Sequence, residues 1–333
     1  MSVVITTRNR LAVLKEAVRS VLTQTHPSCE AIVVDDASSD GTAAWLSEQK
    51  SERLTVVVLD RHRERAVARN RGLDQARGEF VLFLDDDDRL RRTALKRLHS
   101  ALLRDPEAIG AVGAVVLFDS DGNRRRRSHP RRPIKRDVWT DLLAYWMRSL
   151  GSTLFRTDVV RAVGGWNEEV TVSGDRELFV RASRRGPVIL IPYVVHEKRT
   201  HSGQWRAAEI REIQQRWVRE HIDTLPLRER ALALRLTKVY RLLNDARIAY
   251  GNLASTKALS LYWQAVRTAP SVLLSPLLRP VIAEGVAKSL AGAIIGKRGV
   301  LAARGVKRAF RRALGRDVEE VKMRKSLGDT PGG

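Results

Sequence analysis

The chain has 333 residues, of which 43% are apolar, and its formal net charge is +22. This length allows one large domain with an appendage, or two domains, and the apolar content suffices for a folded core. The single cysteine, Cys29, excludes a disulfide framework and a cysteine-built zinc site. No secretory leader is visible, and the longest uncharged apolar stretches near the C-terminus are too short to span a bilayer. We therefore expect a globular, cytoplasmic protein.

The positive charge is concentrated in the C-terminal third. From Leu225 to Gly333, 21 Lys and Arg residues stand against 7 Asp and Glu, a balance of +14, which leaves +8 for the first 224 residues. Apolar segments alternate there with basic ones, a pattern typical of amphipathic helices on an anionic membrane surface, and nucleic acid is the less favoured partner. This pattern predicts peripheral attachment to the inner face of the cell membrane. The alternative is a solvated helical bundle that packs on the main domain.

Strand and helix patterns alternate through the first hundred residues. Short apolar or β-branched runs predict strands, and apolar residues at helical spacing predict helices between them. In chain order, the expected strands are residues 3–6, 31–34, 54–59 and 80–84, and the expected helices are residues 11–22, 42–48 and 65–76. Such alternation predicts an α/β fold of parallel βαβ units with helices on both faces of the sheet.

Polar clusters follow three of the expected strands. They are Thr7-Arg8-Asn9, Asp35-Asp36, and four consecutive aspartates, Asp85 to Asp88. Ligands of such sheets bind beyond the carboxyl ends of the strands. Four adjacent carboxylates repel one another unless a cation neutralises them, and Mg²⁺ or Mn²⁺ with substrate phosphates is the usual solution. The three clusters together predict a nucleotide site; the alternative for the aspartates alone is an acidic turn before a helix.

Several segments together resemble the inverting glycosyltransferases of family 2, in order and at similar separations. The segments are residues 3–10, 24–27, 32–42, 68–73 and 83–88, followed by residues 163–168, 174–175, 191–192 and 199–201. The resemblance covers roughly the first 205 residues. It implies a GT-A fold, a central and mostly parallel sheet flanked by helices, and it stops before the basic C-terminal region, which the charge pattern predicts to be helical.

The resemblance also implies a division into domains. We expect a GT-A domain over residues 1–222, with a nucleotide-sugar-binding half at 1–104 and an acceptor-binding half at 105–222. Residues 223–333 would form the basic helical region, with disordered last residues.

In this family, the residue that matches Asp36 reads the base of a nucleotide-sugar, and Thr7, Arg8 and Asn9 would line that pocket. A carboxylate accepts a hydrogen bond from a base N–H, which fixes the orientation of the base. Arg69 would contact the diphosphate of the donor. The alternative for Asp36 is a turn-forming aspartate.

By the same resemblance, Asp85 and Asp87 match the D-x-D pair, with Asp88 as a third contributor. One carboxylate would meet the donor's ribose or sugar, and another would bind the divalent cation, Mn²⁺ or Mg²⁺, that neutralises charge on the departing nucleoside diphosphate. Asp86 is assigned to donor binding, although relatives often carry a small or neutral residue there.

Asp175 matches the catalytic base of the family. A hydroxyl that attacks an anomeric carbon must lose its proton, and a positioned carboxylate can accept it. Many relatives have Glu-Asp where this chain has Gly174-Asp175, and a helix N-cap is the alternative role. Arg199 and His201 match an Arg-x-His pattern beside the diphosphate and the metal. The remaining histidines singled out, expected in loops without convergent partners, are His26, His62 and His196.

The resemblance implies a metal-dependent glycosyltransferase of the hexosyltransferase type. It would move a sugar from a UDP-, GDP- or dTDP-linked donor to a saccharide or polyprenyl-linked acceptor, in cell-envelope, exopolysaccharide or glycolipid biosynthesis. A metal-dependent nucleotidyltransferase is one alternative, but residues 7–10 are not the glycine-rich, lysine-bearing phosphate loop it needs. A non-enzymatic protein that binds anionic surfaces is another, but it gives no reason for carboxylates at three strand ends.

Overall fold

The computed structural model describes residues 1–119, 124–126, 132–144, 149–171, 173–200, 217–273, 278–279 and 281–294. It divides into two compact units. The first comprises Met1–Arg241 and Ala265–Val281, and the second comprises Leu242–Gln264 and Ile282–Gly333. The functional boundary expected after residue 222 stays a prediction.

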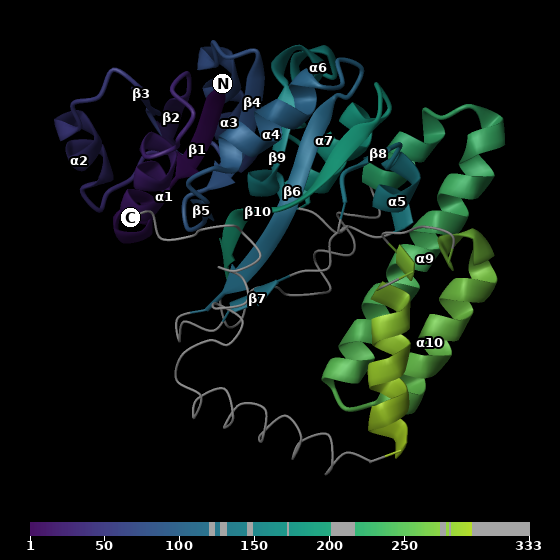
Figure 1. The fold of residues 1–333 in the computed structure, drawn as a ribbon. Coiled ribbons are helices and arrows are strands. Elements are labelled where there is room, and N and C mark those ends of the chain that lie inside the picture. The colour runs from purple at the N-terminus through teal and green to yellow at the C-terminus, as the bar shows by residue number, and fades with distance from the viewer. Residues whose placement is uncertain are drawn as a thin grey trace, which may run out of the picture. The chain divides into compact units, whose positions relative to one another are not determined.

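The first unit is built on one mixed sheet, whose described strands follow the order β3-β2-β1-β4-β9-β6-β10-β5, with β7 beside β6 and β8 beside β10 (Figure 1). The strands are β1 (Ser2–Thr7), β2 (Glu30–Asp35), β3 (Leu54–Val58), β4 (Phe80–Asp85), β5 (Arg89–Leu90), β6 (Gly110–Phe118), β7 (Arg124–Arg126), β8 (Ile134–Arg136), β9 (Thr153–Arg156) and β10 (Val188–Arg199). Strand β9 is antiparallel to both β4 and β6, so β6 and β10 run in the same direction as β1 to β4. The predicted mostly parallel sheet is confirmed.

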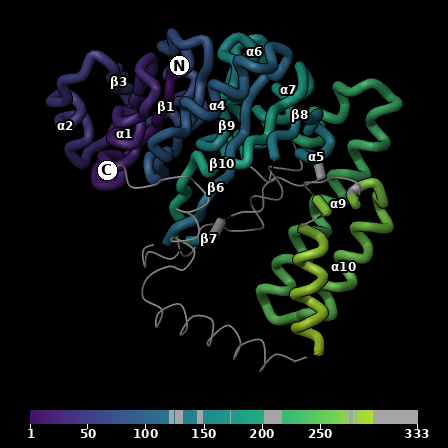
Figure 2. The backbone as a smooth tube through the Cα atoms, viewed as in Figure 1, coloured from purple at the N-terminus to yellow at the C-terminus, as the bar shows by residue number. Residues whose placement is uncertain are grey.

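Helices connect these strands, and Figure 2 traces the alternation along the backbone from purple to teal. The helices are α1 (Leu11–Leu22), α2 (Thr42–Glu48), α3 (Arg65–Gln75), α4 (Ala94–Leu103), α5 (Trp139–Ala144), α6 (Thr157–Ala162), α7 (Gly174–Ser183), α9 (Leu227–Gly251) and α10 (Ser255–Thr268), with short 3-10 turns at Leu150–Ser152 and Pro270–Leu273 and further helical residues at 217–223 and 281–294. Every strand and helix predicted in the first hundred residues is present, with ends shifted by one residue at most.

Helices cover both faces of the sheet. Neighbouring residues of a strand point to opposite faces, so a strand of consecutive apolar residues can pack against a helix on each side. On one face, Ile5 of β1 belongs to the same buried apolar cluster as Leu14 of α1. On the other face, α3 approaches so closely that a Cβ added at Gly72 would lie 2.3 Å from Cγ1 of Val4 and 3.2 Å from Cγ2 of Val34. Glycine at position 72 therefore lets α3 pack directly on β1 and β2.

The register of the parallel strands brings the predicted polar clusters to one edge. Thr7 of β1 pairs with Asp35 of β2, and Thr6 pairs with Asp85 of β4. From β1 the chain continues to β2 on one side, whereas β4 pairs with β1 on the other side. The carboxyl ends of β1 and β4 thus form a topological switch point, where sheets of this kind bind ligands.

The second unit is helical in its described part. It holds the end of α9, most of α10 and helical residues 282–294. Among the described helices of the chain, none is long and apolar enough to cross a membrane.

Candidate active site

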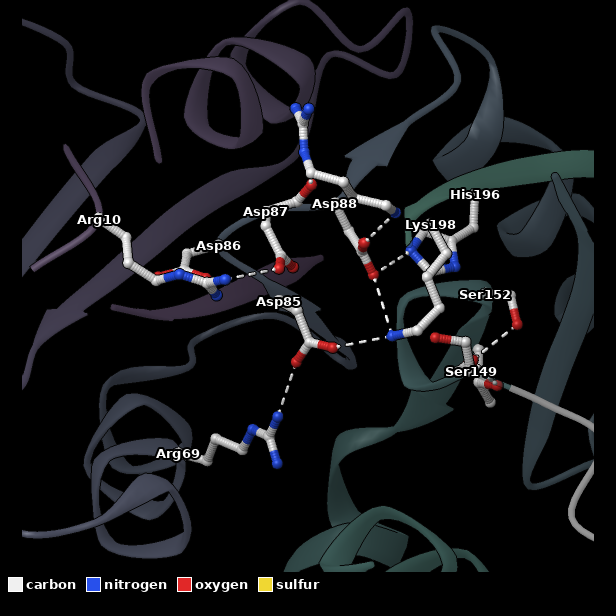
Figure 3. A network of polar contacts seen from close by, with 12 residues as sticks. Arg10, Arg69, Asp85, Asp86, Asp87, Asp88, Ser149, Ser152, His196 and Lys198 are labelled. Atoms are coloured by element: carbon white, nitrogen blue, oxygen red, sulfur yellow. Dashed lines mark hydrogen bonds and ion pairs between the residues drawn. The ribbon is translucent and has the colours of Figure 1, made fainter. Parts of the chain in front are cut away.

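The four aspartates lie where β4 ends and turns toward β5 (Figure 3). The backbone N–H of Asp88 donates to the carbonyl of Asp85 at 3.1 Å and closes the turn. Asp86, Asp87 and Asp88 are buried, whereas the side chain of Asp85 is 38% exposed. Buried carboxylates require charge partners or hydrogen-bond donors, and here these come from β1, α3, β10 and the loop before α1.

Asp85 lies between two cations. Nη2 of Arg69 donates to Asp85 Oδ1 at 2.8 Å, and Nζ of Lys198 donates to Oδ2 at 3.2 Å. Burial alone would raise the pKa of Asp85, but Lys198 and Arg69 hold it well below its usual range. The Arg69 guanidinium also lies 4.2 Å from the ring centre of Trp166, which fixes its plane. Asp85 is therefore an ionised carboxylate at neutral pH.

Asp86 connects the aspartate turn to β1. Its Oδ2 accepts a hydrogen bond from Thr7 Oγ1 at 2.8 Å, and its Oδ1 accepts one from Arg10 Nη1 at 2.8 Å. Burial raises the pKa of Asp86 to about 6 against the opposing effect of Arg10 and Thr7, and the carboxylates of Asp87 and Asp85 raise it further. Arg10 also contacts Asp87 Oδ2 at 3.0 Å.

Asp88 is held entirely by β10. Nε2 of His196 lies 2.8 Å from Asp88 Oδ2, Lys198 Nζ lies 3.4 Å from the same oxygen, and the Arg199 N–H donates to Oδ1 at 2.8 Å. The side chains of His196 and Asp88 are 0% and 1% exposed. The expectation that His196 is a loop residue without partners is wrong, because residues 196 and 198 point to the same side of a strand.

The Arg-x-His pattern is only partly within the described residues. Arg199 reaches the aspartate turn, since its Nε donates to the carbonyl of Asp87 at 3.1 Å, and its Nη2 contacts Glu16 at 3.0 Å. His201 lies outside the described residues.

Three of the four aspartates have the chemistry of a site for a hard divalent cation. Asp85, Asp87 and Asp88 each offer one carboxylate oxygen, and these oxygens lie within 4.8 Å of one another. Mg²⁺ and Mn²⁺ prefer oxygen ligands, so the residues fit such an ion. Each of these carboxylates also contacts a basic side chain, so a cation would share its ligands with Arg10, Lys198 or their neighbours.

Asp36 lies beside Thr7 at the end of β2. Its N–H donates to the Thr7 carbonyl at 2.9 Å, and its Oδ1 accepts a hydrogen bond from the Arg63 N–H at 2.7 Å. Nδ1 of His62 lies 2.6 Å from Asp36 Oδ2. His62 therefore has a convergent partner, contrary to expectation, and so does His26, whose Nε2 lies 3.2 Å from Nδ1 of His99.

The loop after β1 is tied to the loop after β2. The Asn9 N–H donates to Ser38 Oγ at 2.9 Å, and Asn9 Oδ1 accepts a hydrogen bond from the Ser39 N–H at 2.7 Å. Arg8 is exposed on the same loop. The predicted pocket residues Thr7, Asn9 and Asp36 are thus brought together, with Arg8 at their margin.

Left-handed backbone occurs in the loops that border this edge. Four of the five non-glycine residues with positive φ in the described part of the chain are Asn9 (52°), Ala37 (57°), Glu64 (73°) and Ser173 (61°). Such conformations cost about 1–3 kcal/mol each and persist only where the surroundings determine them. Strained loops of this kind are concentrated at functional sites, which agrees with the placement of the site here.

Asp175 stands in the first turn of α7, and the Arg176 N–H donates to its Oδ1 at 2.9 Å. Burial raises the pKa of Asp175, and the charge of Asp85 raises it further, whereas Arg69 and Lys198 oppose the rise. The charges that act on this pKa, besides burial, are those of Asp85 and of its two ion-pair partners Arg69 and Lys198, which indicates that Asp175 lies near the aspartate turn. The side chain of Arg176 is buried and donates to the carbonyls of Leu142 and Leu143 at 2.9 and 2.8 Å, which anchors this end of α7.

Solved structures of other proteins share the fold of this chain. S. aureus TarS 1-349 in complex with UDP-GlcNAc aligns with a TM-score of 0.58 at 18% identity, over 90% of this chain and 91% of that chain. The mannosyltransferase PcManGT from Pyrobaculum calidifontis, in complex with GDP-Man and Mn²⁺, aligns with a TM-score of 0.55 at 19% identity, over 88% and 86%. These likenesses confirm the predicted fold.

Residues 2–164, just under half of the chain, match the family model "Glycosyl transferase family 2". The predicted family resemblance is therefore confirmed. Asp175 and Arg199 lie beyond the matched region.

Curated relatives match a little over a third of the chain. The putative teichuronic acid biosynthesis glycosyltransferase TuaG of Bacillus subtilis is 41% identical over 124 residues, which are 37% of this chain and 49% of that protein. The GalNAc(5)-diNAcBac-PP-undecaprenol beta-1,3-glucosyltransferase of Campylobacter jejuni is 35% identical over 126 residues, 37% of this chain and 40% of that protein. The chain thus spans about half the length of these relatives, or less.

Proposed function

We propose that the protein is an inverting glycosyltransferase that moves a sugar from a nucleotide-diphosphate donor to an acceptor hydroxyl with the help of a divalent cation. The observation that carries the proposal is the convergence of three carboxylate positions at one edge of the sheet. The N–H of Asp36 donates a hydrogen bond to the Thr7 carbonyl, and the Thr7 hydroxyl donates one to Asp86 of the aspartate turn. The charge of Asp85 raises the pKa of Asp175. The match to the family model and the shared fold support the assignment.

The donor is a UDP-, GDP- or dTDP-linked sugar in this proposal. Asp36 would accept a hydrogen bond from the base, in the pocket lined by Thr7, Arg8 and Asn9. TarS binds UDP-GlcNAc and PcManGT binds GDP-Man, which supports a nucleotide-sugar without choosing between bases. Arg69 would contact the diphosphate, and its ion pair with Asp85 at the carboxyl end of β4 supports this role.

The cation would be Mn²⁺ or Mg²⁺, held by Asp85 and Asp87 with Asp88 or His201 as further ligands. Its role when bound is to neutralise the negative charge of the departing nucleoside diphosphate. The all-oxygen donor set of the cluster and the Mn²⁺ of PcManGT support this assignment. Arg199 would complete the cluster, because it already contacts the backbone of Asp87.

Asp175 would act as the general base. The acceptor oxygen forms a bond to the anomeric carbon while the bond from that carbon to the phosphate oxygen breaks, and the hydroxyl proton passes to the Asp175 carboxylate. The nucleoside diphosphate leaves with the bonding electrons, and one displacement inverts the anomeric configuration. A raised pKa makes Asp175 a stronger base than an ordinary carboxylate, which suits this role.

Two substitutions test the proposal. Asp87→Ala should abolish Mn²⁺-dependent stabilisation by UDP, GDP or dTDP, measured as a shift in melting temperature. Asp175→Asn should retain that stabilisation and lose turnover by about 10²–10⁴-fold in an assay of nucleotide-sugar consumption. Asp74→Asn, at an exposed carboxylate on α3, is the matched control and should behave as the parent protein. Near-normal turnover by Asp175→Asn would require another base, and no stabilisation of the parent protein by any nucleotide would contradict the transferase assignment.

The acceptor is a saccharide or a polyprenyl-linked saccharide in this proposal, within cell-envelope, exopolysaccharide or glycolipid biosynthesis. The Campylobacter relative is named for an undecaprenol-linked acceptor and TuaG for teichuronic acid biosynthesis, which supports this class. We further propose that the basic C-terminal region attaches the protein to the inner face of an anionic membrane. The relatives and solved structures favour neither a nucleotidyltransferase nor a non-enzymatic binding protein.

A further inference from the structure

Lys198 occupies an unexpected place for a basic side chain. It reaches from β10 between two of the three carboxylates suited to a cation, with its Nζ at 3.2 Å from Asp85 Oδ2 and 3.4 Å from Asp88 Oδ2 (Figure 3). Its side chain is 27% exposed, so the ammonium is partly screened from water by the site itself. One ammonium group thus bridges the pair of carboxylates.

An ammonium group and a divalent cation that contact the same carboxylate oxygens repel each other, so the presence of one weakens the binding of the other. A Mg²⁺ or Mn²⁺ ion lies about 2.1 Å from its oxygen ligands. With Lys198 Nζ at 3.2 Å from Asp85 Oδ2, an ion on that oxygen would lie within about 5 Å of the ammonium. At such a separation two positive charges repel strongly unless an anion lies between them.

The formal charges of the cluster lead to the same conclusion. At neutral pH the carboxylates of the four aspartates form ion pairs with three side chains that carry full positive charges, Arg10, Arg69 and Lys198, which leaves one net negative charge among these seven groups. A divalent cation alone would make the cluster positive. A cation together with the phosphates of a nucleoside diphosphate would return it to a negative or neutral state, so the two ligands should bind better together than singly.

We propose that Lys198 is an internal counter-ion that keeps the cation site closed until a nucleoside diphosphate arrives. Its four-carbon stem is flexible, so the ammonium can exchange the carboxylates of Asp85 and Asp88 for phosphate oxygens. The phosphate oxygens of the donor then replace the carboxylates as the partners of the Lys198 ammonium. The carboxylates of Asp85 and Asp88 become free to bind the divalent ion. This inference rests on the proposed function, because it assigns ordered binding to the same site.

The test measures binding and not activity. Free Mn²⁺ is titrated with the full chain and followed by electron paramagnetic resonance, with and without a saturating nucleoside diphosphate chosen from UDP, GDP and dTDP. For the parent protein we expect the nucleotide to strengthen Mn²⁺ binding at least about tenfold. Lys198→Met retains the length and apolar stem but removes the charge. It should bind Mn²⁺ alone about tenfold more tightly than the parent, and the strengthening of Mn²⁺ binding by the nucleotide should fall by about the same factor relative to the parent.

Lys135 provides a matched control, because its Nζ also bridges two carboxylates, Asp105 and Glu107, at 2.9 and 3.1 Å on another part of the surface. Lys135→Met should leave both Mn²⁺ affinities unchanged. Circular dichroism verifies folding, and Lys198→Gln replaces the methionine variant if that one does not fold.

The possible outcomes separate the two claims. If the parent protein binds nucleotide with Mn²⁺ but Lys198→Met binds Mn²⁺ no more tightly, the counter-ion role is wrong and the transferase assignment stands. If the parent protein binds neither Mn²⁺ nor any of the nucleotides, the proposed function fails, and the inference fails with it.

Discussion

Asp86 is a carboxylate of the cluster that stabilises the fold through its hydrogen bonds. It accepts hydrogen bonds from Thr7 and Arg10, yet burial and its acidic neighbours raise its pKa to about 6, so its charge is poorly favoured. Asp86→Asn keeps an acceptor for the Thr7 hydroxyl and removes the unfavourable charge. We expect it to change the free energy of unfolding by less than about 1 kcal/mol, whereas Asp86→Ala, which leaves the buried Thr7 hydroxyl unpaired, should cost about 1–3 kcal/mol.

Urea unfolding of the two variants in metal-free buffer checks this difference. Equal destabilisation by Asn and Ala would show that the charge of Asp86, and not its hydrogen bonds, holds the end of β1. The residue assigned to donor binding from the sequence would then have mainly an electrostatic role.

The acidic side of the site could be predicted from the sequence, but most of its basic side could not. Asp85 to Asp88 are adjacent in the chain and follow an apolar strand, so their grouping requires no knowledge of the fold. Lys198 and His196 meet them only because β10 passes the end of the aspartate turn, more than a hundred residues later. The available signal was the spacing of residues 196 and 198, which places both on one side of a strand.

At the scale of elements, the helix over residues 217–223 provides a pH-dependent contact with α7. Burial lowers the pKa of His221 to about 4, and Arg184, which follows α7, and Arg181 of α7 lower it further. Its Nε2 is buried without a hydrogen-bond partner among the described residues. The folded protein therefore favours neutral His221, whereas the unfolded chain binds a proton below about pH 6.5.

Because the unfolded state binds more protons between about pH 6.5 and 4, stability should fall as the pH falls through this window. The contribution of His221 is on the order of 2 kcal/mol at pH 4.5 relative to pH 7. His221→Gln should lose correspondingly less stability than the parent protein between these pH values, as measured by urea unfolding. Identical losses for both proteins would show that this helix does not hold His221 neutral.

The strand and helix pattern of the first half was predictable for a physical reason. Its parallel strands are short apolar runs, and the helices between them carry apolar residues on one face. The short runs and the helical spacing of apolar residues are therefore both visible in the sequence. The polar clusters fall together because parallel register aligns carboxyl ends, as the pairing of Thr7 with Asp35 demonstrates. The pairing of β9 against β4 and β6 depends on long-range contacts, which local patterns do not encode.

At the scale of the whole molecule, the second unit combines exposed apolar side chains with the basic C-terminal third. On α10, Trp263 is 63% exposed, and the helical residues Leu290 and Ile294 are 48% and 82% exposed. Exposed lysines and arginines of the same unit lie at positions 247, 257 and 288. Apolar side chains and basic charge together favour the surface of an anionic bilayer, where Trp inserts at the headgroup level.

The full chain should therefore sediment with vesicles that contain phosphatidylglycerol and not with neutral phosphatidylcholine vesicles, and added salt should weaken the binding. Trp263→Ser should weaken it by about three- to tenfold, because the apolar area of the ring no longer inserts. Leu103→Ser is the matched control, since Leu103 is 62% exposed on α4 in the first unit, and it should bind as the parent protein does. Equal sedimentation with both vesicle types, or none with either, would favour the solvated helical bundle instead, because that structure needs no lipid to satisfy its charge.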